Sequence, residues 1–208
     1  MSTHISIRNF TLALATLLFF VFASASSAHA EGPGTKTVRG ANDKLSAMLG
    51  SKATTPAAEK KLVEQARAKL GNFLDIEELG KRALKDHWAT LSATQQAEFT
   101  QLLTDLIETN YVKGLRSNVK YKVEYLGESP KGKFLLVKTV IKAKRKGRPL
   151  TIEVDYLLRK SGKSLRTFDI MTDGVGLVEN YRAMFNKIIA KSGFDALLGK
   201  MRKKLAAM

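Results

Sequence analysis

The chain has 208 residues and carries 35 lysines and arginines against 19 acidic residues, a formal net charge of +16. It contains no cysteine, which excludes disulfides, thiol nucleophiles, thiolate metal sites and a lipid anchored on cysteine. A positive charge of this size predicts attraction to anionic partners, such as lipid headgroups, cell-envelope polymers or acidic protein surfaces.

The first thirty residues have the pattern of a cleavable secretory signal. Arg8 precedes the apolar run 10–23, and the segment ends in Ala28-His29-Ala30, a small-x-small site. The run is shorter than the ~20 residues that a membrane-spanning helix needs, which disfavours a retained anchor. We expect cleavage after Ala30 and export of the mature protein. Cleavage removes one basic residue and no acidic one, so the charge falls to +15. Export argues against a nucleic-acid partner.

Helical spacing dominates the first half of the mature chain. Residues 31–39, rich in glycine and threonine, predict a flexible leader before a single domain over 40–208. Apolar residues then recur at helical intervals as far as residue 117. We predict a helix starting near Pro56, another capped by Asp75, and a long one from Ser92 to about Arg116.

The apolar period changes to two after Asn118, as expected for strands with one apolar face. The expected strands cover 119–125, 134–143, 150–158 and 164–172. Turn residues between them predict an antiparallel meander, and helical spacing returns over 175–190 and 194–205. This order predicts an α+β fold, with helices over one face of a curved, mainly antiparallel four-stranded sheet.

Catalytic and metal-binding patterns are weak. After cleavage His87 is the single imidazole, and no cluster has zinc-ligand spacing. Glu153 and Asp155 alternate with apolar residues, so we place them on the polar side of a strand. Asp173 is explained by helix capping. Asp169 and the tyrosines remain as acid–base candidates for an enzyme.

Several segments resemble the MlaC family, also called toluene-tolerance auxiliary proteins. They are Phe-Leu-Asp-Ile-Glu-Glu-Leu-Gly-Lys-Arg-Ala-Leu-Lys-Asp-His-Trp at 73–88, Thr-Gln-Gln-Ala-Glu-Phe at 94–99, Val-Asp-Tyr-Leu-Leu-Arg at 154–159 and Asp-Gly-Val-Gly-Leu-Val-Glu-Asn-Tyr-Arg-Ala-Met-Phe at 173–185. The last is similar to the long family signature, although Gly176 and Glu179 depart from it, as Lys85 departs from a frequent glycine.

This resemblance implies a periplasmic carrier whose helices and curved sheet enclose an apolar lipid cavity. Such a protein needs no cofactor and no catalysis. It carries diacyl phospholipid between an outer-membrane lipoprotein complex and an inner-membrane ABC transporter with its periplasmic substrate-binding subunit, which maintains outer-membrane lipid asymmetry. A hopanoid-associated branch of the family, a cavity-bearing isomerase-like enzyme and a polyanion-binding surface protein stay open as alternatives.

Two groups of candidate site residues follow if the protein is such a lipid carrier. The candidate cavity walls, each equally compatible with ordinary core packing, are Leu102, Leu103, Leu106, Tyr125, Val137, Val154, Tyr156, Phe168, Val175, Val178, Tyr181 and Phe185. The candidate docking residues are Lys144, Arg145, Lys146 and Arg148, which otherwise form a solvated hairpin tip.

Overall fold

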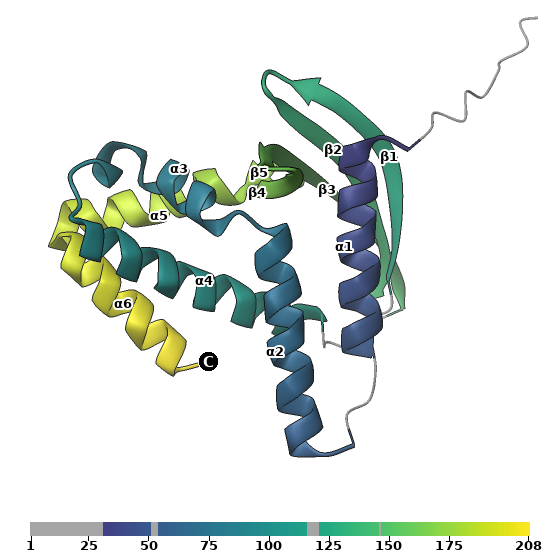
Figure 1. Cartoon of the computed structure of the whole chain (residues 1–208), viewed down its shortest axis with the longest axis horizontal. Coiled ribbons are helices and arrows are strands. Elements are labelled where there is room, and N and C mark those ends of the chain that lie inside the picture. The colour runs from purple at the N-terminus through teal and green to yellow at the C-terminus, as the bar shows by residue number, and fades with distance from the viewer. Residues whose placement is uncertain (1–30, 51–53, 116–120, 146) are drawn as a thin grey trace, which may run out of the picture. The chain divides into compact units, whose positions relative to one another are not determined.

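Helices flank a single antiparallel sheet in the part of the chain that the structure describes (Figure 1). The structure is a computed structural model and describes residues 31–50, 54–115, 121–145 and 147–208. The expected signal peptide and Lys146 lie outside these residues. The helices are α1 Pro33–Gly50, α2 Pro56–Phe73, α3 Ile76–Trp88, α4 Ala93–Leu115, α5 Leu177–Ser192 and α6 Phe194–Ala206. The strands are β1 Tyr121–Lys131, β2 Phe134–Arg145, β3 Arg148–Ser161, β4 Ser164–Thr172 and β5 Val175–Gly176.

Side-chain caps set the starts of α2, α3 and α4. The side chains of Thr55 and Asp75 each accept the backbone N–H three residues further on. Ser92 and Gln95 exchange hydrogen bonds between side chain and backbone in both directions, which is a capping box. These caps satisfy N–H groups that a helix leaves free at its start. The predicted helix starts at Pro56, Asp75 and Ser92 are therefore confirmed.

The leader expected over residues 31–39 is mostly helical instead, because α1 begins at Pro33. Proline suits the first turn of a helix, where its missing N–H is not needed. Val38 is fully buried. Gly34 allows α1 to lie close to the sheet, since a Cβ atom there would be 3.0 Å from Cγ2 of Val137.

The sheet has the order β1-β2-β3-β4-β5 and every neighbouring pair is antiparallel. This confirms the predicted α+β meander. The strand count changes from four to five, because Val175 and Gly176 fold back on Met171 and Thr172 as β5. That pair is too short to leave a period-two pattern in the sequence.

The main core lies between the inward face of the sheet and the helices. Val137, Thr139, Val154 and Tyr156 are buried on this face, where Val137 pairs with Tyr156 and Thr139 with Val154. Helix α1 lies along β1 and β2, while α3, α4, α5 and α6 pack together beyond the other edge of the sheet (Figure 1). Among the described residues, no helix combines the length and apolar content that crossing a bilayer requires.

Candidate functional site

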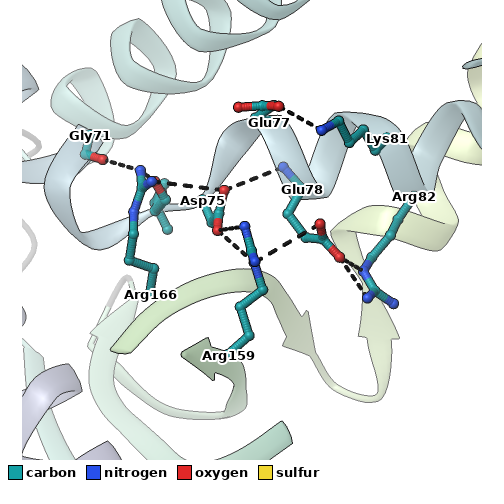
Figure 2. A network of polar contacts seen from close by, with 9 residues as sticks. Gly71, Asp75, Glu77, Glu78, Lys81, Arg82, Arg159 and Arg166 are labelled. Carbon is teal, nitrogen blue, oxygen red and sulfur yellow. Dashed lines mark hydrogen bonds and ion pairs between the residues drawn. The ribbon is translucent and has the colours of Figure 1, made fainter. Parts of the chain in front are cut away.

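A polar network at the α2–α3 junction fixes the position of the neighbouring helices (Figure 2). Asp75 is 2% exposed, and its Oδ2 accepts a hydrogen bond from Nε of Arg159 on β3 at 2.7 Å and forms an ion pair with Nη2 of the same side chain at 2.6 Å. Arg166 on β4 donates to the backbone carbonyls of Gly71 and Leu74 at 2.6 and 2.5 Å. The junction is thereby tied to two strands, which places Leu74 beside the sheet.

A second set of contacts joins α3 to α5. Arg82 pairs with Glu78, and its guanidinium lies 4.4 Å from the ring centre of Phe168. Arg182 on α5 donates through Nη2 to the backbone carbonyl of Arg82 at 2.8 Å. Arg182 thus joins two of the segments that resemble the MlaC family.

Two adjoining apolar cavities lie along α4, and we call them together the α4 groove. The first, of about 360 Å³, opens between α4, β4 and α5. The second, of about 320 Å³, opens between α4, α5 and α6. The two share Asn110 and Tyr181. The first is lined by Leu74, Ile107, Asn110, Tyr111, Ile170, Leu177 and Tyr181. The second is lined by Leu103, Leu106, Asn110, Tyr181, Met184, Phe185, Ile188, Leu197, Lys200, Met201 and Lys204.

The chemistry of the groove suits an aliphatic group that carries an anion. Burial raises the pKa values of Tyr111 and Tyr181, so both phenols are neutral at physiological pH. Lys200 and Lys204 are exposed and lie one turn apart on α6. The groove therefore combines an uncharged apolar lining with two ammonium groups at the second cavity.

The structure brings together four of the twelve expected wall residues. Leu103, Leu106, Tyr181 and Phe185 line the second cavity, and Tyr181 also lines the first. Of these, Leu103 and Phe185 are almost fully buried, whereas Leu106 and Tyr181 are half-buried.

The other eight lie outside the lining of the α4 groove. The buried ones that belong to the main core are Leu102, Val137, Val154, Tyr156 and Val178. Tyr125 packs under α1, where its hydroxyl is 3.1 Å from Nδ2 of Asn42. Phe168 is buried apart from the main core, with its ring centre 4.8 Å from that of Phe134. Val175 is 56% exposed, because it lies on the short strand before α5.

Sequence reasoning missed several lining residues. Ile107 and Tyr111 follow Leu103 at intervals of four, so helical periodicity could have placed all three on one face of α4. Met184, Ile188 and Met201 become lining residues through the packing of α5 and α6 on α4, which local periodicity does not reveal.

The acid–base candidates have structural partners. Oδ1 of Asp169 accepts the backbone N–H of Val178 at 3.1 Å, in the first turn of α5. Burial raises the pKa of Asp169, and hydrogen bonds from backbone N–H groups oppose that shift. Asp173 does not cap α5 as predicted, because it lies in a tight turn with φ of 48° and accepts the N–H of Glu153. Nε2 of His87 is 3.1 Å from Oδ1 of Asn186. The described residues contain no cluster able to hold a metal ion.

Comparisons with known proteins agree with this architecture. The family model described as "MlaC protein" matches residues 39–203. The intermembrane phospholipid transport system binding protein MlaC of Haemophilus influenzae is 26% identical over 135 residues, 63% of this chain. The matched region spans 62% of that relative's length.

A solved structure shares the fold. The phospholipid-binding protein from Ralstonia solanacearum, in complex with a phospholipid, aligns with a TM-score of 0.68 and 22% identity. The alignment covers 86% of this chain and 98% of that chain. Together with the family match over most of the sequence, this leads to one assignment: the chain belongs to the MlaC protein family.

Proposed function

We propose that this protein is a periplasmic phospholipid carrier that holds the acyl chains of a diacyl phospholipid in the α4 groove. The observation that carries the proposal is the pair of adjoining apolar cavities on α4, with Lys200 and Lys204 beside the second. Family membership supports it, since the relative from Haemophilus influenzae and the structure from Ralstonia solanacearum are both named for phospholipid.

Simple energetics explain how such a site would hold its cargo. Each methylene moved from water into an apolar groove contributes ~0.8 kcal/mol. A phosphate is too costly to bury, so the headgroup would stay at the solvent edge. Lys200 and Lys204, which line the second cavity, would attract it there. Binding of this kind uses neither nucleotide nor covalent chemistry.

The partners and location complete the proposal. The signal peptide would be cleaved after Ala30 and leave one mature domain that includes α1. The carrier would pass lipid between an outer-membrane lipoprotein complex and an inner-membrane ABC transporter with its periplasmic substrate-binding subunit. Lys144, Arg145, Lys146 and Arg148 at the β2–β3 turn would dock on acidic partner surfaces.

Mass spectrometry of lipids extracted from the mature protein, purified without detergent, tests the proposal. We expect near-stoichiometric diacyl phospholipid in the wild type. Leu106→Trp should fill part of the second cavity, and displacing about two methylenes costs about 1.6 kcal/mol, roughly tenfold in lipid affinity.

Leu126→Trp is the matched control, because Leu126 is 63% exposed on β1. It should keep its lipid, and circular dichroism should show both variants melting cooperatively. A wild type that is empty after gentle purification would refute the carrier. A polycyclic hopanoid in place of diacyl lipid would instead assign the chain to the hopanoid-associated branch.

A further inference from the structure

A polar pocket of about 540 Å³ lies between α1, α2 and the β3–β4 turn, and we call it the lysine pocket. Its lining residues are Pro33, Lys36, Thr37, Gly40, Ala41, Lys44, Leu45, Lys69, Asn72, Phe73, Lys163, Ser164 and Leu165. None of them lines the α4 groove. The lysine pocket is therefore a second concave site, made by other elements of the fold.

Four lysines from three elements meet at this pocket. Lys36 and Lys44 come from α1, Lys69 from α2, and Lys163 from the turn between β3 and β4. No acidic residue is among the described residues that line it. None of the four lysines forms an ion pair with any residue that the structure describes.

Some other cations that the structure describes have acidic partners. Arg39, on α1 as well, lies 2.6 Å from Oε1 of Glu31. On the sheet, Lys142 pairs with Glu124 at 2.7 Å. Gathering four ammonium groups without a counter-charge costs free energy through mutual repulsion, which a bound anion would relieve.

We propose that the lysine pocket binds a phosphate group. An ammonium group is a compact point charge that binds phosphate well, and four of them can neutralise a multiply charged anion. The side chains of Ser164 and Asn72 add hydroxyl and amide donors to the lining of the pocket. The volume lies within the usual range of small-ligand sites. The phosphate comes either from a soluble phosphate compound or from a lipid headgroup at a membrane surface.

Calorimetry with inorganic phosphate and pyrophosphate, and flotation with phosphatidylcholine vesicles with and without phosphatidylglycerol, test this at low salt. The test variant is Lys36→Gln/Lys44→Gln/Lys69→Gln/Lys163→Gln. The control, Lys60→Gln/Lys61→Gln/Lys187→Gln/Lys191→Gln, removes the same charge from exposed positions on α2 and α5. Pyrophosphate affinity should fall about tenfold or more in the test variant and less than about twofold in the control.

The calorimetry and the vesicle flotation together identify the source of the phosphate. Loss of phosphatidylglycerol-dependent flotation together with pyrophosphate binding assigns the pocket to a lipid headgroup. Loss of pyrophosphate binding alone assigns it to a soluble compound. A double variant, Lys44→Gln/Lys163→Gln, repeats the comparison with a smaller change to the surface.

Three results would overturn the proposal. They are a wild type that binds neither phosphate probe nor anionic vesicles, equal losses in test and control variants, and pocket-dependent binding of poly-glutamate without binding of phosphate. The last would assign the pocket to an acidic protein segment. Lipid content is measured in every variant, so failure of the α4 groove as a carrier site is seen separately.

Discussion

Asp75 concentrates several structural roles in one side chain. It caps α3, pairs with Arg159 and lies 3.9 Å from Nη1 of Arg166, yet it is 2% exposed (Figure 2). Removing one partner of a buried pair leaves uncompensated charge, although both arginines keep about a third of their side-chain surface in water. We expect Asp75→Ala to lower the free energy of unfolding by about 3 kcal/mol, measured by urea denaturation.

Two further variants separate the contribution of the helix cap from that of the buried charge. Asp75→Asn keeps an oxygen that can cap α3 but loses the charge, so it should destabilise less than alanine. Glu77→Ala removes the exposed pair with Lys81 on the same helix and should change stability by no more than about 0.5 kcal/mol. Equal effects of Asp75→Ala and Glu77→Ala on the free energy of unfolding would show that the buried network stabilises the protein no more than an exposed ion pair does.

At the scale of elements, a carboxylate on β1 ties the first turn of α1 to the sheet. Oε2 of Glu128 on β1 accepts the backbone N–H and the hydroxyl of Thr35, at 2.5 and 3.0 Å. A negative charge at the start of a helix is also favoured by the helix dipole. Glu128→Ala should destabilise α1 by about 1–2 kcal/mol and speed amide hydrogen exchange over residues 36–48.

Glu124→Ala is the matched control, on the same strand. Glu124 pairs with Lys142 at the surface, so its loss should leave exchange in α1 unchanged. If exchange in α1 is the same in both variants, the Glu128 contact does not anchor the helix.

The elements that could be predicted from the sequence are those whose signals are local. The cap at Asp75 and the strand Ser164–Thr172 depend on residues a few positions apart. Helix α1 escapes such reasoning because its anchor, Glu128, lies 93 residues after Thr35. The same holds for the first turn of α5. Asp169 on the neighbouring strand β4 accepts its N–H, whereas the sequence pattern predicted that Asp173, next to the helix, would do so.

Part of the candidate site was predictable from helical periodicity, including Tyr181 and Phe185 on α5. Leu103 and Leu106 lie on α4, whose apolar face is periodic, and both line the groove. Val154 and Tyr156 also lie on a periodic apolar face, but α-helices cover that face and bury both residues in the core. Alternation identifies the inward side of a strand, and only tertiary packing decides whether that side meets a cavity.

For the whole molecule, the charge of +15 over residues 31–208 makes association sensitive to salt. Lys144 and Arg148 belong to the last two rungs of the β2–β3 hairpin and are exposed. Lys144→Glu/Arg145→Glu/Lys146→Glu should slow lipid transfer to anionic acceptor vesicles about tenfold at low salt, because rim charges act on association. Bound lipid should be unchanged, since Lys144 is not among the described residues that line the α4 groove.

The salt dependence and a matched variant decide whether the hairpin tip itself causes the slower lipid transfer. Near 1 M salt the Debye length is about 3 Å, so the rates of wild type and variant should converge there. Lys60→Glu/Lys61→Glu/Lys187→Glu makes the same change of charge at exposed positions on α2 and α5 and should slow transfer much less. Equal slowing by the two variants would mean that net charge alone steers the protein, and that the β2–β3 turn has no docking role of its own.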